Sequence, residues 1–287
     1  MNKDFAVFIM VYGRPQKEWT YKTLRKCGYT GQVYFVGDDL DVTINEYKKK
    51  YGDKLIIFDK KKSAKGLDTG DNTGDFRSTL FASNKIFELA KERGIKYFFI
   101  MCDDYFEFTY RFDNHCNYVT NKYVGNLDAT FNSMVKFMKT NTQVSSIAMA
   151  QTGDFIGGEK GSMVKGGSII VKRKVMNTFL CSTERRFKFM GRLNEDITTY
   201  INLGSKGFVF LTIPLLAINQ KQTQSAKGGL TEVYKKYGTY VKSFFSVMYN
   251  PSSVKVYLMG ESNKRLHHRV SWNNAVPKIL NEKHKVI

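Results

Sequence analysis

The chain has 287 residues, of which 42% are hydrophobic and 14% aromatic, a composition that excludes a disordered tail and favours a globular protein with a sizeable core. The net charge is +19 and uneven: residues 1–159 carry 23 Lys and Arg against 20 Asp and Glu (+3), and residues 160–287 carry 22 against 6 (+16). This asymmetry indicates a polyanionic partner such as nucleic acid, because Lys and Arg that neutralise phosphates dominate sequence-independent binding; a merely soluble basic surface is the alternative.

Strands and helices alternate through residues 1–159, as they do in nucleotide-binding α/β domains. We therefore expect a mostly parallel sheet flanked by helices, in which ligands bind at the carboxyl ends of the strands. The predicted strands are residues 5–12, 32–39, 54–60, 96–108 and 144–151. Four helices are predicted: one that ends near residue 27, one that ends near residue 51, and two at residues 76–94 and 127–139.

The second half adds one predicted strand, at residues 164–171, and becomes basic from Lys172 onward. No internal repeat, low-complexity tract or Pro-rich linker separates the halves. We therefore expect a single domain over residues 1–287, in which the basic half, residues 160–287, packs against residues 1–159.

Asp103 and Asp104 directly follow the apolar run at residues 97–101. Two carboxylates at the end of a buried strand are costly to desolvate without a cation. Oxygen ligands suit Mg²⁺ or Mn²⁺, which also bind a diphosphate. The alternative is that the acids form a turn or cap a helix.

Other polar residues are predicted at the same edge of the sheet. Gly13-Arg14 and Asp38-Asp39 end the first two strands. Arg77 and Asn84 lie seven residues apart on the predicted helix at 76–94, so they would share one face, which either contacts a ligand or faces solvent.

Glu195 and Asp196 form the second acid pair, among Arg185, Arg186, Lys188 and Arg192. The basic surroundings should keep the carboxylates ionised, as a general base requires. The same residues would also begin a helix well, and both interpretations hold together.

His267 and His268 are the only adjacent histidines. Neighbouring residues of a strand point to opposite faces, so at most one of them reaches a given site. That one could complete a metal shell as a neutral imidazole, while the other contacts solvent or nucleic acid. The pattern does not choose between them.

Basic and aromatic residues are interleaved between residues 220 and 259. This pattern suits a nucleic-acid surface on which Lys residues contact phosphates and aromatic rings stack on bases. The alternative is a core strand with one face in solvent. The residues that we expect to contact DNA are Lys172, Arg173, Arg185, Arg186, Lys188, Arg192, Lys227, Lys235 and Lys236.

With these residues in place, the chain resembles a GT-A glycosyltransferase. The segments YGRP, VGDD and FFIMCDDY and the helix bearing Arg77 and Asn84 occur in that family's order, followed by the Glu195-Asp196 pair and the late histidines. Within the superfamily it is similar to the phage and TET-associated DNA-base glycosyltransferases, through KGGLTEVYKKYGTYVKSFFSVMYNP and HHRVSWNNAVPKIL.

This resemblance implies a UDP-sugar donor bound by residues 1–159, a Mn²⁺ or Mg²⁺ cofactor, and the hydroxymethyl group of a DNA base as acceptor. It implies Asp196 as the base, with Glu195 as the alternative, and inversion at the anomeric carbon. Asp104 and His267 or His268 would hold the metal. The usual Asp-x-Asp tract reads Cys102-Asp103-Asp104 here, which leaves open which acid binds ribose. The donor-binding residues implied are Tyr12, Gly13, Arg14, Asp38, Asp39, Arg77, Asn84 and Asp103.

Several alternatives remain open at this level. The sugar could be glucose or arabinose, and the base hydroxymethylcytosine or hydroxymethyluracil. A glycan or protein acceptor, or a non-catalytic nucleic-acid-binding protein, would be the rival functions. The scattered cysteines, the lack of signal-peptide features and the shortness of the apolar stretch at residues 207–218 predict a cytoplasmic protein without a membrane partner, in the host cytoplasm if a phage encodes it.

Overall fold

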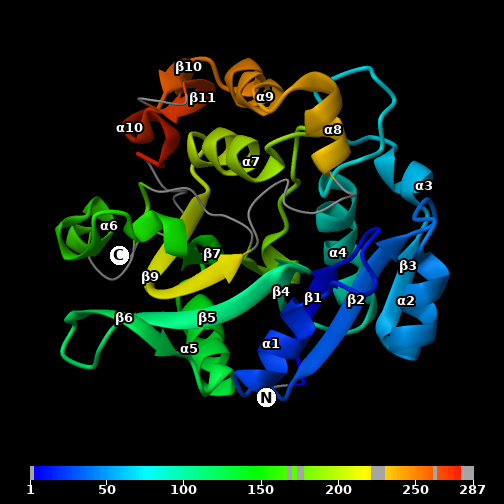
Figure 1. The fold of residues 1–287 in the computed structure, drawn as a ribbon, viewed down its shortest axis with the longest axis horizontal. Helices are drawn as coiled ribbons and strands as arrows, with labels where there is room; N and C mark the ends of the chain where they lie inside the picture. The colour runs from blue at the N-terminus through cyan, green and yellow to red at the C-terminus, as the bar shows by residue number, and fades with distance from the viewer. Residues whose placement is uncertain (1–2, 167–169, 173–177, 221–229, 261–263, 279–287) are drawn as a thin grey trace.

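The computed structural model describes residues 3–166, 170–172, 178–220, 230–260 and 264–278. In these residues a nine-stranded sheet crosses the molecule with helices on both faces, and a two-stranded sheet lies at one end (Figure 1). In spatial order the large sheet contains β3 (Leu55–Phe58), β2 (Gln32–Asp38), β1 (Phe5–Met10), β4 (Tyr97–Cys102), β8 (Thr178–Ser182), β7 (Val144–Gln151), β9 (Val209–Gln220), β5 (Tyr105–Phe112) and β6 (Tyr118–Tyr123).

The sheet is mostly parallel. The neighbouring strands β3, β2, β1 and β4 pair in parallel, as do β7 and β9. β8 is antiparallel to β4 and β7, and β5 is antiparallel to β9 and β6. All strands except β8 and β5 therefore run in one direction. The α/β architecture expected from the sequence, a mostly parallel sheet between helices, is confirmed.

The central strands are buried on both faces, which explains their nearly continuous apolar runs. In β1, Phe5, Val7 and Ile9 enter one core cluster, and Ala6 and Phe8 enter the other. The first cluster is covered by α1 (Thr20–Lys26), α2 (Ile44–Tyr51) and α5 (Leu127–Thr140), and the second by α3 (Lys60–Ala64), α4 (Leu80–Glu92) and α7 (Glu195–Gly204).

The C-terminal elements form a further layer over α7 (Figure 1). Val254 and Ala275 join the cluster beneath α7, while Leu193, Val233 and Phe245 form a small cluster of their own. The layer contains α8 (Leu230–Tyr237), α9 (Val241–Tyr249), β10 (Val254–Met259), β11 (Arg265–Val270) and α10 (Trp272–Ala275). Because β8 and β9 lie within the large sheet, residues 1–159 and the basic residues 160–287 contribute to one core.

Three expected elements differ from the structure. Instead of a strand at residues 164–171, the chain forms α6 (Ser162–Lys165) and an isolated bridge at Ile170, with Gly166 between them and residues 167–169 outside the described part. Glycine weakens a strand interior, so a continuous strand there is not favoured. The expected strand at 96–108 is divided at the acid pair into β4 and β5, which have different neighbours.

The third difference is the start of the long helix, which is Leu80 and not Phe76. Asp75 therefore does not cap the helix; it binds Arg77. The basic, aromatic stretch after residue 229 is also helical, in α8 and α9, before it enters β10. Among the described helices, none combines the length and apolar composition needed to cross a membrane.

Candidate active site

The carboxyl ends of β1 and β4 meet at one edge of the sheet. The two strands pair in parallel with Met10 opposite Cys102, so the residues that follow each strand are neighbours. Nη2 of Arg14 donates to Oδ1 of Asp103 across this edge. The structure thus brings together two of the polar segments that the sequence places at strand ends.

The first turn of α1 fixes the backbone of the acid pair. The Trp19 amide donates to the Asp103 carbonyl at 2.8 Å, and Oγ1 of Thr20 donates to the Cys102 carbonyl at 2.6 Å. The same Thr20 oxygen accepts from the Tyr105 amide at 3.0 Å. The chain can therefore leave β4, turn sharply and begin β5 while both carboxyl groups stay at the edge.

The carboxyl groups of this pair are buried and incompletely bonded. Asp103 is 1% exposed, and burial raises its pKa to about 7 even though Arg14 opposes the shift. Burial also raises the pKa of Asp104. Within the described chain, Oδ2 of Asp103 and Oδ1 of Asp104 find no hydrogen-bond partner. Buried polar atoms normally have partners, so this arrangement fits residues that receive a cation or a ligand.

Two glutamines extend the site along the sheet. Gln151 ends β7 and Gln220 ends β9, and Nε2 of Gln151 donates to Oε1 of Gln220 at 3.0 Å. A side-chain hydrogen bond between Gln220 and Asp104 lowers the pKa of that carboxyl and partly offsets its burial. Neither glutamine was expected in the site from the sequence, although Gln151 is the last residue of a correctly predicted strand.

The loop after β1 is held by Asp41, which lies between β2 and α2, and by Tyr47 of α2. Gly13 has a φ of +67°, which favours glycine, and its amide donates to Oδ2 of Asp41 at 2.8 Å. The Arg14 amide donates to the Tyr47 hydroxyl at 2.9 Å. Asp41 and Tyr47 were not expected in the site, because their contribution depends on how α2 packs and not on a local motif.

Asp38 and Asp39, expected to contact the donor, are engaged with Lys60. Nζ of Lys60 lies 2.8 Å from Oδ2 of Asp38, and the Lys60 amide donates to Oδ1 of Asp39 at 2.9 Å. The same ammonium lies 4.8 Å from the centre of the Tyr12 ring. These contacts tie the ends of β1, β2 and β3 together and use part of the hydrogen-bonding capacity of both acids.

Arg77 and Asn84 do not share a face of α4, because Arg77 precedes the helix. Arg77 pairs with Asp75, and its charge affects the pKa of Tyr12, so it lies near the end of β1. Asn84 is 5% exposed, and its amide bonds the backbone of Leu80 and of Phe189. Asn84 therefore joins α4 to the chain leading to α7.

The second acid pair opens α7. Asn194, with a φ of +59°, precedes the helix, and Oγ1 of Thr79 donates to Oε1 of Glu195. Oδ1 of Asp196 accepts from the Ile197 amide at 2.8 Å. Burial, and next the charge of Asp196, raise the pKa of Glu195 to about 7. A carboxyl with such a pKa can accept a proton near neutral pH.

Both acid pairs act on the pKa of Cys102. Burial raises the pKa of Cys102 most, followed by the charges of Asp104 and Asp103, and the charge of Glu195 adds to them. Glu195 and Asp196 likewise raise the pKa of Tyr234, after burial. Cys102 at the end of β4 and Tyr234 of α8 are therefore both affected by the charge of Glu195, which opens α7.

The structure distinguishes the two histidines of β11. Nδ1 of His268 lies 3.4 Å from Nδ2 of Asn194, directly before the second acid pair. The ring of His267 stacks on that of its cross-strand partner Tyr257, with 6.3 Å between centroids, and meets the His268 ring edge-on, with 4.3 Å between centroids. Over the described ranges, no three His, Cys, Asp or Glu side chains converge closely enough to hold a metal by themselves.

Three of the arginines expected to contact DNA serve the fold or pair with an acid. Arg192 is 2% exposed, and Nη2 lies 2.6 Å from Oδ2 of Asp71. Arg185 donates to three backbone carbonyls around the end of α5, and Arg186 pairs with Glu88 at 3.1 Å. Arg192, expected to contact DNA, is instead buried, because the segment before α7 packs against the loop at residues 66–79.

The direction of β8 explains where Arg185 and Arg186 lie. Ser182 is opposite Tyr97, the first residue of β4, and the Thr183 amide bonds the Lys96 carbonyl. The two arginines follow at the amino end of β4, whereas Asp103 lies beyond its carboxyl end. Because β8 is antiparallel, they lie at the opposite edge of the sheet from the acid pair.

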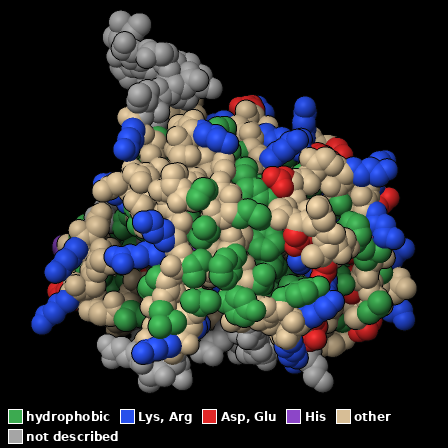
Figure 2. Space-filling model, turned by 90° about the horizontal axis from the view of Figure 1, so that it is seen from above, with side chains coloured by type: hydrophobic (Ala, Val, Ile, Leu, Met, Phe, Trp, Pro, Cys, Tyr) green, Lys and Arg blue, Asp and Glu red, His purple; other side chains and the backbone are tan. Residues whose placement is uncertain are grey.

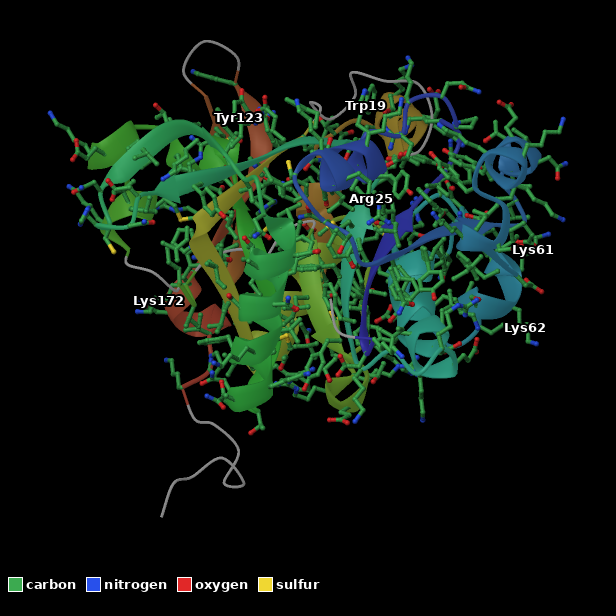
Figure 3. The ribbon with its side chains drawn as sticks, turned by 90° about the horizontal axis from the view of Figure 1, so that it is seen from below. Trp19, Arg25, Lys61, Lys62, Tyr123 and Lys172 are labelled. Atoms are coloured by element: carbon green, nitrogen blue, oxygen red, sulfur yellow. The ribbon has the colours of Figure 1, made fainter. Side chains whose placement is uncertain are left out.

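The remaining expected DNA contacts divide into two groups. Lys172, Lys188, Lys235 and Lys236 are exposed, while Arg173 and Lys227 lie outside the described residues. Lys172 projects on the side of the molecule opposite to α3, whose Lys61 and Lys62 are labelled with it in Figure 3.

Most of the chain matches the model of one protein family. The model of the TET-Associated Glycosyltransferase family matches residues 5–229, which include both acid pairs. The chain belongs to this family. The family expected from the sequence is thereby confirmed, and the protein is a glycosyltransferase. The match ends before α8, so the layer from α8 to α10 lies beyond it.

Other similarities are more distant. One similar solved structure is glucosyl-3-phosphoglycerate synthase from Mycobacterium tuberculosis, with 9% identity, 93% of this chain and 86% of that chain covered, and a TM-score of 0.45. Another is mannosyltransferase PcManGT from Pyrobaculum calidifontis, with 11% identity, 86% of this chain and 62% of that chain covered, and a TM-score of 0.48. A 93-residue segment is 30% identical to the baseplate tail-tube junction protein gp54 of Enterobacteria phage T4 and spans 31% of this chain and 28% of that protein.

Proposed function

We propose that this glycosyltransferase moves a glucose or arabinose unit from a UDP-sugar to the hydroxymethyl group of a modified pyrimidine in DNA, with inversion. The observation that carries the proposal is the pairing of two buried acid sites, at Asp103-Asp104 and Glu195-Asp196, with a C-terminal half of net charge +16. A nucleotide-sugar site explains the acids, and a DNA acceptor explains the charge, which a neutral glycan would not require.

The donor would bind at the carboxyl ends of β1 and β4, with residues 1–159 supplying most of its contacts. Arg14 holds Asp103, and Asp104 is the acid that we assign to Mn²⁺ or Mg²⁺, with His268 as the second protein ligand. The orphan oxygens of Asp103 and Asp104 fit such a role. Magnesium-like ions commonly take one or two carboxylates and complete their shell with phosphates and water. When bound, the ion offsets the charge that develops on the departing diphosphate.

The base would come from the second acid pair. The sequence favours Asp196, but the pKa near 7 of Glu195 and its influence on Cys102 favour Glu195. As the hydroxymethyl oxygen bonds to the anomeric carbon, the bond from that carbon to the UDP oxygen breaks, and UDP leaves with the electron pair. The hydroxymethyl proton passes to the Glu195 carboxylate. Attack opposite to the leaving group inverts the anomeric centre.

A transfer assay tests the proposal. The protein is incubated with Mn²⁺, a panel of UDP-sugars, and DNA that contains hydroxymethylcytosine, hydroxymethyluracil or neither, and the digested nucleosides are weighed by mass spectrometry. We expect a sugar mass on a hydroxymethylated base only. Transfer to a glycan or protein substrate, with none to any DNA, would overturn the DNA acceptor. A melting temperature that UDP and Mn²⁺ do not change would overturn the donor site.

A further inference from the structure

β10 and β11 form an antiparallel two-stranded ribbon with two different faces. Val254 and Val270 are cross-strand partners on the face that packs into the core, and His268 on the same face reaches Asn194. Successive side chains of a strand alternate between faces. The opposite face therefore carries Lys255, Tyr257, Met259, Arg265, His267 and Arg269.

This outer face concentrates positive charge. Lys255, Arg265 and Arg269 are exposed, and no ion pair links any of them to an acid in the described residues. Residues 250–260 and 264–278 contain no Asp or Glu at all. Lys255 is directly opposite Arg269 in the ribbon, an arrangement of like charges that weakens a cross-strand pair. A polyanion on this face would turn that repulsion into attraction.

The shape of the face also suits nucleic acid. The rings of Tyr257 and His267 stack with an angle of 15° between their planes and lie between the cations of the two strands. A two-stranded ribbon is narrow enough to enter the major groove of duplex DNA. Figure 2 looks onto the end of the molecule that carries α8, α9 and the ribbon, and shows Lys and Arg side chains spread around an apolar centre, with most acidic side chains on the right.

We propose that the outer face of the β10–β11 ribbon binds the sugar–phosphate backbone of duplex DNA, through Lys255, Arg265 and Arg269. This inference rests on the proposed DNA acceptor and adds a surface beyond the residues expected from the sequence. The inner face of the same ribbon meets Asn194, next to Glu195, through His268. DNA held on the ribbon is therefore anchored beside the second acid pair, on the layer that follows the family-matched residues.

Salt-dependent binding tests the inference. The triple variant Lys255→Gln, Arg265→Gln, Arg269→Gln is compared with the wild type for binding a short unmodified DNA duplex over a series of NaCl concentrations. Each lost phosphate contact should reduce the slope of log affinity against log salt by about 0.9, so we expect a reduction of about two to three. The matched control removes three exposed lysines of the first half, Lys48→Gln, Lys61→Gln and Lys62→Gln, and should keep the wild-type slope.

Two further measurements make the result decisive. The charge-conserving variant Lys255→Arg, Arg265→Lys, Arg269→Lys should bind as the wild type does, and all variants should show the same rise in melting temperature with UDP and Mn²⁺. If the Gln variant binds DNA with an unchanged slope while the wild type transfers sugar to DNA, the ribbon inference is overturned and the proposed function stands. If the wild type shows no salt-dependent DNA binding, both are overturned.

Discussion

The two acid pairs of this glycosyltransferase have the same kind of residue but different surroundings. Asp103 is fixed at the end of a central strand, where Arg14 partly neutralises it and neighbouring oxygens lack partners. Glu195 opens a helix beside Thr79, and the nearby Arg192 is paired with Asp71 and does not neutralise it. Burial raises the pKa of both carboxyls to about 7. This difference supports the proposal that the first pair receives a cation, through Asp104, and that the second pair accepts a proton.

The first prediction removes the cation site. Asp104→Asn should lower transfer by about a thousandfold, because the several kcal/mol that a bound ion supplies to the transition state are lost. UDP with Mn²⁺ should no longer raise the melting temperature, as measured by thermal denaturation. The exposed Asp53 provides a control, and Asp53→Asn should behave as the wild type does. A wild-type UDP response in Asp104→Asn would place the metal elsewhere.

The second prediction separates the members of the other pair. Glu195→Gln should lower kcat by about a hundredfold or more, the usual contribution of a positioned base, with little change in UDP or DNA binding. Asp196→Asn should have a smaller effect. Single-turnover transfer and equilibrium binding of both variants measure this. The opposite ranking would return the base role to Asp196, which the sequence favours.

Much of the fold could be predicted from the sequence, because a continuous apolar run identifies a strand that is buried on both faces of a parallel sheet. β7 was predicted at its observed bounds, and β1 and β2 within two residues. The strands β6, β8 and β9 were not predicted. β6 and β8 are short and carry little periodicity of their own, and the apolar run that forms β9 could not be assigned to a strand from its hydrophobicity alone. The orientation of β8 is a tertiary property, and it decides that Arg185 lies far from the acid pair.

The site was partly predictable for the same reason. Residues that follow a strand within a few positions, such as Arg14 after β1 and Asp103 after β4, could be found from the sequence and do meet in space. Residues that support them from other elements, such as Asp41 and Gln220, could not, because their contacts join segments far apart in the chain. The burial of Arg192 likewise depends on the loop that folds over it, whereas its sequence context is that of a basic surface.

The third prediction concerns that arginine. Arg192→Ala should lower the free energy of unfolding by about 3 kcal/mol, because it leaves Asp71 and Asp75 near each other without their shared cation. The exposed Lys188, four residues earlier, is the control, and Lys188→Ala should change stability by less than about 0.5 kcal/mol. Urea denaturation measures both. Equal stability of the two variants, with weaker DNA binding by Arg192→Ala, would contradict the structural role.

The last prediction uses pH to test the contrast between the pairs. A glutamate base must be ionised, and because the pKa of Glu195 is raised to about 7, the active form is present above that pH and is lost as pH falls through it. The rate of the transfer step should therefore fall about tenfold for each pH unit below the pKa, as for any single essential base. Single-turnover rates at saturating donor and acceptor measure this profile.

The donor site should respond differently. A cation shared by the first pair favours the ionised carboxylates, so with Mn²⁺ present the pKa of Asp103 should fall below its value in the free protein. UDP protection in Mn²⁺ should then persist at pH values where transfer has already declined, because the ion keeps the first pair charged while Glu195 becomes protonated. Parallel loss of protection and transfer would mean that one titration controls both pairs, and the distinction between a cation site and a proton-accepting site would fail.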